Sequence, residues 1–200
     1  QINPHFLFNA LEAIQYGIRD NPDETERVLR LLARNLRRLA SWERETIALR
    51  DELRFVEEYL QIQKFRYGDR LHYRLDVEQQ LLQTEIPNLL LQPLVENAVI
   101  HGVRDMDDGY IKIWAEGNAG ELRLFVQDNG RGMDTPKDGA LGFGVSGRPV
   151  EHLGLFNVDS ILRLHFGDEY GLSVRSAPGE GCLVMVRLPM KKEAEREGKA

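Results

Sequence analysis

The stretch Pro93-Leu-Val-Glu-Asn-Ala-Val-Ile-His-Gly102 is the most informative part of the sequence, because it combines a helical pattern with three polar side chains on a short span. We expect a helix over residues 88–102, kinked or properly beginning at Pro93, since proline suits the first turn of a helix. Such a helix places Glu96, Asn97 and His101 along about a turn and a half. An amide oxygen such as that of Asn97 can bind Mg²⁺ alongside phosphate oxygens and water. Taken alone, the stretch is equally typical of a buried helix with a polar outer face.

A second polar stretch, Asp128-Asn-Gly-Arg-Gly-Met133, directly follows a predicted strand. A carboxylate at a strand end can accept a hydrogen bond from an exocyclic amine such as that of adenine. Gly130 and Gly132 allow the backbone to pass close to a flat base. The alternative is an ordinary turn, because Asn-Gly is a common turn sequence.

A third stretch, Gly154-Leu-Phe-Asn-Val158, opens a predicted helix and follows the glycine-rich residues 134–149. The N–H groups at a helix start can cradle phosphate, so Gly154 and Leu155 are candidate contacts. A helix start packed on a sheet is the alternative. Gly142–Gly147 spells a dinucleotide fingerprint, but it lacks the preceding strand and following helix that such a site requires. We therefore interpret 134–149 as a lid.

The remaining pattern divides the chain near residue 70. Residues 1–67 are helical in pattern, and the first helix carries one apolar stripe composed of Leu7, Leu11, Ile14 and Ile18. A second helix is expected from Asn21-Pro22, and a third from near Arg50. Beyond residue 70, strands are predicted at 72–77, 110–115, 122–127, 172–176 and 182–188, with a helix at 153–166.

The three polar stretches, in this order, resemble the N, G1 and G2 boxes of the ATP-binding fold shared by histidine kinases, gyrase, Hsp90 and MutL. Within that group the chain is most similar to the LytS/YesM-type sensor histidine kinases. Their phosphoacceptor box reads like Gln1-Ile-Asn-Pro-His-Phe-Leu-Phe-Asn9, and their closing hairpin like Ser176-Ala-Pro-Gly-Glu-Gly-Cys-Leu-Val184. Arg66-Tyr-Gly-Asp-Arg70 and Phe166-Gly-Asp-Glu-Tyr-Gly171 match as well. The similarity covers nearly the whole chain.

The resemblance implies an α+β fold. Residues 1–70 would form a helical phosphoacceptor and dimerisation region. Residues 71–190 would form a GHKL (Bergerat-type) ATP-binding domain, an α/β sandwich with a mixed sheet and helices on one face. Residues 191–200 would be a charged tail.

The resemblance also implies a function, that of the cytoplasmic kinase core of a two-component sensor histidine kinase. Asp128 would hold adenine, Asn97 would carry Mg²⁺ on the phosphates of ATP, and Gly154 with the lid would shield them. His5 would take the γ-phosphoryl group and pass it to an aspartate of a response regulator, and the protein would be a homodimer. Without a downstream ATP site, His5 would be interpreted as a surface or interface histidine; with it, we expect the phosphate acceptor.

Three positions depart from the family pattern. Phe6 follows His5, where many histidine kinases have an acidic residue, so the base or orienting group is expected to be Asn9 or Glu96. Ile100 stands where many relatives have lysine. His152 replaces a glycine that is usual before Gly154.

Composition excludes several other classes of protein. A net charge of −6 argues against a general nucleic-acid binder. The single cysteine, Cys182, excludes an internal disulfide and a cysteine-based metal cluster, and it fits a reducing compartment. The spacing of the histidines predicts no zinc site. No apolar run approaches the ~18 residues of a membrane-spanning helix, so we expect this portion to be cytoplasmic and attached to a bacterial membrane only through segments outside this sequence.

Three rival functions fit the sequence less well. Water-hydrolysing ATPases of the gyrase or Hsp90 type use a glutamate four residues before the Mg²⁺-binding asparagine, where this chain has Pro93. A non-catalytic nucleotide-binding module would be favoured by loss of Asp128, Asn97 or the glycines, and all of these are present. A serine kinase of the anti-sigma type would leave the residues around His5 unexplained. The sequence therefore favours an ATP-dependent protein-histidine kinase.

Overall fold

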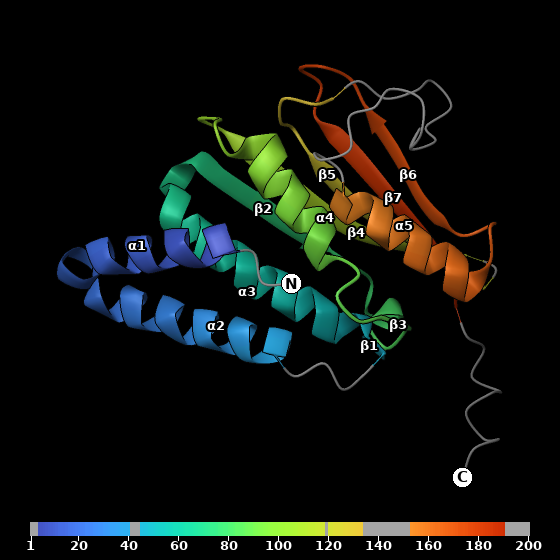
Figure 1. Cartoon of the computed structure of the whole chain (residues 1–200), viewed down its shortest axis with the longest axis horizontal. Helices are drawn as coiled ribbons and strands as arrows, with labels where there is room; N and C mark the ends of the chain where they lie inside the picture. Colours follow the sequence, from blue (N-terminus) through green and yellow to red (C-terminus); the bar gives the residue numbers. More distant parts are fainter. Residues whose placement is uncertain (1–3, 41–44, 119, 134–152, 191–200) are drawn as a thin grey trace, which may run out of the picture.

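The computed structural model describes residues 4–40, 45–118, 120–133 and 153–190. Three helices come first, α1 (Pro4–Asp20), α2 (Pro22–Ala40) and α3 (Leu49–Tyr67). α1 and α2 lie side by side as a helical hairpin, with α3 against both (Figure 1). Asn21 begins α2 as predicted, because its Oδ1 accepts a hydrogen bond from the backbone N–H of Glu24 at 3.4 Å.

A five-stranded sheet with the order β2-β4-β5-β7-β6 forms the centre of the second part. Its strands are β2 (Leu71–Asp76), β4 (Gly109–Asn118), β5 (Glu121–Asp128), β6 (Gly171–Ser176) and β7 (Cys182–Pro189). Only the β2–β4 pairing is parallel, so the sheet is mixed, as expected. A two-stranded sheet pairs β1 (Thr46–Ala48) with β3 (Glu85–Pro87), and two short 3₁₀ helices are present, η1 (Gly68–Arg70) and η2 (Gln79–Leu81).

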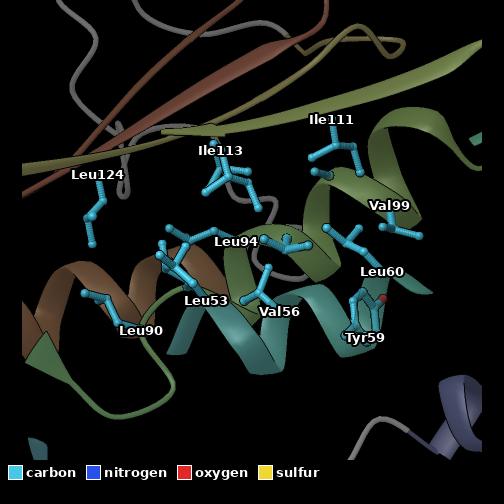
Figure 2. Close-up of a cluster of buried hydrophobic side chains, with 14 of the residues drawn as sticks. Leu53, Val56, Tyr59, Leu60, Leu90, Leu94, Val99, Ile111, Ile113 and Leu124 are labelled. Carbon is cyan, nitrogen blue, oxygen red and sulfur yellow. The ribbon is translucent and has the colours of Figure 1, made fainter. Parts of the chain in front are cut away.

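Helices cover one face of the large sheet. They are α4 (Gln92–Asn97), its continuation η3 (Ala98–Val103), and α5 (Leu153–Phe166) (Figure 1). Figure 2 shows Ile111 and Ile113 of β4 pointing from the sheet toward Leu94 of α4, with side chains of α3 on the far side of α4. The predicted α+β class, with a mixed sheet and helices on one face, is confirmed. The division at residue 70 stays a prediction, since α3 packs against both β2 and α4.

One prediction about secondary structure was wrong, and one left two alternatives open. The first 67 residues were expected to be helical, yet β1 lies within them. Strands of three residues are too short to show a period of two, which is why β1 and β3 escaped the pattern. For the helix predicted over 88–102, the structure selects the alternative start near Pro93: α4 begins at Gln92 with Pro93 in its first turn, and Leu89 before it has a positive φ of 59°.

The predicted apolar stripe of α1 is only partly buried within this chain. Ile14 is buried, but Leu11 and Ile18 are 45% and 58% exposed. The buried face is instead composed of Phe6, Ala10 and Ile14, because α1 contacts both α2 and α3 and this line of residues faces the space between them. The predicted lid, His152 and the charged tail lie outside the described residues.

Candidate nucleotide site

The helix that carries Glu96 and Asn97 forms one wall of the candidate site. α4 ends at Asn97 and continues as a π-helix, a wide turn found frequently at functional sites. Glu96 is half-buried, and its Oε1 accepts a hydrogen bond from Gln92 Nε2 at 3.0 Å. Burial raises the pKa of Glu96, and the hydrogen bond from Gln92 opposes that rise. A carboxyl group with a raised pKa exchanges its proton closer to neutral pH.

Asn97 lies against the start of α5. A Cβ atom on Gly154 would be 3.5 Å from Asn97 Nδ2 and 3.9 Å from Pro93 Cβ, so the two predicted motifs meet here. Asn97 Nδ2 is buried and has no hydrogen-bond partner among the residues that the structure describes. A buried polar group left without a partner costs about 1–3 kcal/mol. This arrangement fits a site in which a ligand reorganises or satisfies the amide.

Leu155 can offer the candidate site only its backbone, which is the kind of contact that its motif predicted. Its side chain is 1% exposed and belongs to the hydrophobic core. Only its backbone can therefore contact a phosphate, as part of the first turn of α5.

Asp128 ends β5 and forms the floor of the site. Its residue is 6% exposed, and Oδ1 accepts a hydrogen bond from the backbone N–H of Gly130 at 2.9 Å. Burial raises the pKa of Asp128 to about 6, against the opposing effect of the backbone N–H groups of Gly130 and Cys182. Above that pH the group is a buried carboxylate, an acceptor suited to an amine donor.

Glycines allow the backbone to close around this carboxylate. A Cβ atom on Gly102 would lie 2.7 Å from the Oδ1 atom of Asp128, so the end of η3 can approach the carboxylate only with glycine there. Gly130 packs against the backbone of Gly102 with no room for a side chain. Gly132 has a φ of 64°, and a side chain on it would collide with the carbonyl of Ala177. The passage of Gly130 and Gly132 close to a base stays a prediction, and the close approach of Gly102 to Asp128 was not predicted.

His101 also reaches the second motif. Arg131 Nη2 lies 3.4 Å from His101 Nδ1, which links η3 to the loop after β5. Sequence reasoning assigned no role to Arg131. Its position inside a quoted motif that also carries a predicted site carboxylate was the signal that could have identified it.

The closing hairpin supports the loop after β5. Ser176 Oγ accepts a hydrogen bond from the backbone N–H of Met133 at 2.9 Å and donates one to the carbonyl of Gly181 at 2.5 Å. Cys182 pairs with Asp128 across β5 and β7, and burial first, then the charge of Asp128, raises the pKa of its thiol to about 12. The thiol is therefore neutral at physiological pH. Ser176 and Cys182 are more than 40 residues from Asp128 in sequence, so spacing gave no signal for them.

The helix that carries His5, α1, shares a small recess with η3, the continuation of the helix that carries Glu96 and Asn97. The backbone of His5 belongs to the first turn of α1, and its side chain is outside the described set. One residue on, Phe6 packs against Tyr59 of α3 with ring centroids 5.0 Å apart. Asn9 is half-buried and lines a small recess together with Ile100 of η3. The predicted catalytic residue Asn9 and the nucleotide-site helix are thus brought together.

The residues fit a nucleotide with its metal. The orphaned amide of Asn97, the buried Asp128 carboxylate and the glycine-lined loop at Gly130 and Gly132 are the features such a ligand needs. Among the described residues, no three His, Cys, Asp or Glu side chains gather as a metal site of their own. A metal here would depend on Asn97 and on phosphate oxygens.

Comparison with known proteins defines the class. Residues 84–192 match the family of histidine kinase-, DNA gyrase B- and HSP90-like ATPases, and residues 1–71 match the histidine kinase family. The chain belongs to the histidine kinase-, DNA gyrase B- and HSP90-like ATPase family. The predicted resemblance to sensor histidine kinases is confirmed.

Individual relatives agree with this assignment. The chain is 37% identical over 195 residues to the sensor histidine kinase BtsS of Escherichia coli, covering 97% of this chain and 33% of that protein. It is 32% identical over 195 residues to the sensor histidine kinase YesM of Bacillus subtilis, covering 96% of this chain and 33% of that protein. The chain therefore spans about a third of the length of these relatives.

Solved structures share the fold at low sequence identity. The catalytic domain of histidine kinase ThkA superposes with a TM-score of 0.56 at 16% identity, covering 74% of this chain and 97% of that domain. The histidine kinase domain of a blue-light activated kinase from Erythrobacter litoralis gives a TM-score of 0.51 at 18% identity, covering 84% of this chain and 73% of that one. A complex of ThkA with the response regulator protein TrrA also matches, with a TM-score of 0.56, 16% identity, and coverage of 87% and 52%. In the part of the chain that the structure describes, no helix is long and apolar enough to cross a membrane.

Proposed function

We propose that this chain is the kinase core of a two-component sensor histidine kinase, the cytoplasmic portion of a membrane-anchored bacterial sensor. It binds Mg-ATP, transfers the γ-phosphoryl group to His5, and passes that group to an aspartate of a response regulator. The main support is that Asn97, Asp128 and Gly154 surround one candidate site, while Phe6 and Asn9 of α1 line one recess with Ile100 of the helix that follows Asn97. The solved complex of ThkA with TrrA supports a response regulator as partner.

Each end of the nucleotide would have its own contacts. The Asp128 carboxylate would accept a hydrogen bond from the adenine amine, and the loop at Gly130 and Gly132 would pass close to the base. Asn97 would hold Mg²⁺, which neutralises charge on the phosphates. The backbone of Gly154 and Leu155, at the start of α5, would face the phosphate oxygens.

Phosphoryl transfer would then depend on the orientation of His5. A neutral imidazole nitrogen attacks the γ-phosphorus in line; the N–P bond forms as the bond to the β,γ-bridging oxygen breaks, and ADP leaves with that electron pair. The proton on the other imidazole nitrogen is held or accepted by a neighbouring group. Our candidates are Glu96, whose pKa is raised by burial, and Asn9, one helical turn after His5.

The test is transfer of label from γ-labelled ATP with Mg²⁺. We expect the wild type to take label that is lost in acid and kept in base, and we expect none from α-labelled ATP. His5→Gln should take no label but still bind ATP, since it removes only the acceptor. Asn97→Ala should lower the rate of labelling at least about 100-fold, because it removes the side chain that would hold Mg²⁺.

Controls decide the interpretation. Glu12→Gln, an exposed change on α1, should label like the wild type. Label that persists in His5→Gln would refute the assignment of the acceptor. The assay is repeated on the full-length protein. If that protein binds Mg-ATP but takes no label, the kinase activity is refuted and a nucleotide-binding module remains.

A homodimer is part of the same proposal, and α1 supplies its surface. Phe8, Leu11 and Ile18 are 71%, 45% and 58% exposed and lie along one stripe of the helix. Exposed apolar stripes of this kind mark interaction surfaces, and a second copy of the helix would cover this one.

The dimer prediction can be tested with paired charges. Leu11→Glu with Ile18→Glu should raise the dissociation constant at least about tenfold, because two carboxylates would face an apolar interface. Light scattering after size exclusion would measure the mass, with Glu12→Gln as the control. A dimer of unchanged affinity and unchanged helical content in the double variant would place the interface elsewhere.

A further inference from the structure

A small recess lies where α1, α3 and η3 meet. Its walls include Phe6 and Asn9 of α1, Tyr59 and Arg66 of α3, and Arg104 just after η3. Its volume is about 20 Å³, room for a group about the size of a water molecule. A phosphoryl oxygen can enter such a space, and a nucleoside cannot.

The lining of the recess includes a buried polar group, the hydroxyl of Tyr59, that lacks a hydrogen-bond partner among the described residues. Tyr59 is fully buried, and no hydrogen bond of acceptable geometry satisfies its hydroxyl among the described residues, although the side chain of Gln63 lies near it. Figure 2 shows Tyr59 at the edge of the buried cluster. A buried hydroxyl without a hydrogen-bond partner is costly. The presence of one here suggests a ligand atom that accepts a hydrogen bond from it.

The mouth of the recess is positively charged. Arg66 is half-buried, donates a hydrogen bond to the hydroxyl of Tyr67 at 3.0 Å, and forms no ion pair with any carboxylate in the described ranges. Arg104 is 44% exposed and has only a distant contact, 3.8 Å, with Asp105. Two arginines therefore line this recess together with the buried, unsatisfied hydroxyl of Tyr59. This chemistry suits an oxyanion, and guanidinium groups bind phosphoryl oxygens well.

The recess also has the right place on α1. Asn9, in its wall, is four residues after His5, which is one helical turn. We propose that Arg66, Arg104 and the Tyr59 hydroxyl form a phosphoryl-binding subsite that positions the group exchanged between ATP and His5 of the same chain. This inference rests on the proposed function. It assigns Arg66 and Arg104 a positioning role that the three nucleotide motifs do not contain.

The decisive variants are made in the full-length protein. Arg66→Gln should lower the rate of labelling from saturating Mg-ATP at least about tenfold, with the affinity for ATP changed less than about twofold. Arg66→Lys should recover part of the rate, because it restores the charge but not the planar fork. Tyr59→Phe keeps the ring that contacts Phe6 and should show a smaller fall of a few fold.

Arg54→Gln is the matched control. It removes an arginine from the same helix at a 63% exposed position away from the recess, so labelling should equal the wild type. A second measurement, the hydrolysis rate of purified labelled protein, distinguishes whether the subsite holds the phosphoryl group on His5 or the γ-phosphate of ATP. Faster loss of label in Arg66→Gln would place the phosphoryl group of His5 in the subsite. Slower labelling with unchanged hydrolysis would place the γ-phosphate of ATP there.

Inorganic phosphate tests the subsite without catalysis. Millimolar phosphate should raise the melting temperature of the nucleotide-free wild type, and the rise should be smaller in Arg66→Gln than in Arg54→Gln. Equal labelling rates in the wild type and Arg66→Gln would overturn the subsite. If the wild type takes no label, the proposed function fails, and the phosphate shift alone decides: equal shifts in Arg66→Gln and Arg54→Gln would overturn the subsite as well.

Discussion

Replacement of Asp128 by asparagine is expected to stabilise the nucleotide-free protein at pH 8 and to weaken ATP binding by about 10- to 100-fold. The second effect follows because a hydrogen bond to a charged group contributes about 1.5–3 kcal/mol, and the asparagine lacks the charge. The first follows from the burial of the carboxylate in the absence of a ligand. One substitution would thus separate the stability of the site from its function.

The sign of the pH dependence comes from the raised pKa of Asp128. Its pKa is 3.8 without the fold and about 6 within it, so the folded protein binds more protons between these values. Stability from this group is therefore complete below about pH 4 and is lost as the pH rises through 6. The shift of about two units corresponds to about 3 kcal/mol. The Asp128→Asn variant would regain less than that, because its NH₂ group replaces an oxygen where backbone N–H groups donate.

The measurement is urea denaturation of the wild type and Asp128→Asn from pH 4 to pH 8, without nucleotide. The free energy of unfolding of the variant minus that of the wild type should increase as the pH rises. Glu121→Gln, at the opposite end of β5, is the control. Hydrogen bonds from Arg123 and Arg187 lower the pKa of Glu121, so its removal should give no such gain and should leave ATP affinity unchanged.

ATP affinity itself supplies the contradicting outcome. Because the ionised Asp128 would accept the adenine amine, wild-type affinity should fall below about pH 6 and be flat above it. A wild-type affinity that stays constant down to pH 5 would contradict the assignment of Asp128 to adenine. A variant less stable than the wild type at pH 8 would contradict the account of its burial.

The sequence predicted the parts of the site that lie within one motif and missed the contacts between motifs. Asn97, Asp128 and Gly154 were predicted separately, and each motif contains the residue types its chemistry needs. The contact of Gly102 with Asp128 joins two motifs, and the support from Ser176 joins a third segment. Such contacts depend on how the sheet and helices pack, which periodicity does not encode.

The fold shows the same limit. Long elements with a clear period, such as α3 and β5, were predicted close to their observed positions. The residues of α1 that are buried within this chain differ from its predicted apolar stripe, because a helix that packs on two neighbours buries the line between them. For residues 88–91 the sequence left open a kinked helix or a start at Pro93, since nothing local shows that a distant carboxylate holds them in another conformation.

That carboxylate belongs to Glu52, and its removal is expected to have the largest effect on stability. Glu52 of α3 is completely buried and pairs with Arg38 Nη2 at 2.6 Å. It also accepts hydrogen bonds from the backbone N–H groups of Leu91 at 3.0 Å and Leu89 at 3.3 Å. Arg38 in turn donates to Asn88 Oδ1 at 2.6 Å. The pair therefore ties α2 and α3 to the segment that leads into α4.

Glu52→Ala should lower the free energy of unfolding by about 3–5 kcal/mol, because it leaves a buried guanidinium and two backbone N–H groups without their acceptor. Leu89 has a positive φ, which is strained for a side chain of this size, so the segment should also rearrange once its acceptor is gone. The start of α4 would then move, and with it Asn97. We expect ATP affinity to fall together with stability, although Glu52 would not contact ATP.

Two comparisons make this prediction specific. Glu57→Ala removes an exposed glutamate from the same helix and should cost no more than about 0.5 kcal/mol in urea denaturation. Replacing both Arg38 and Glu52 by methionine should recover part of the lost stability. The double variant leaves no guanidinium buried without its carboxylate, unlike Glu52→Ala. A cost below about 1 kcal/mol for Glu52→Ala, with unchanged ATP affinity, would show that the segment before α4 keeps its conformation without this carboxylate. The coupling of the helical part to the nucleotide site would then have to pass through the packing of α3 on α4 alone.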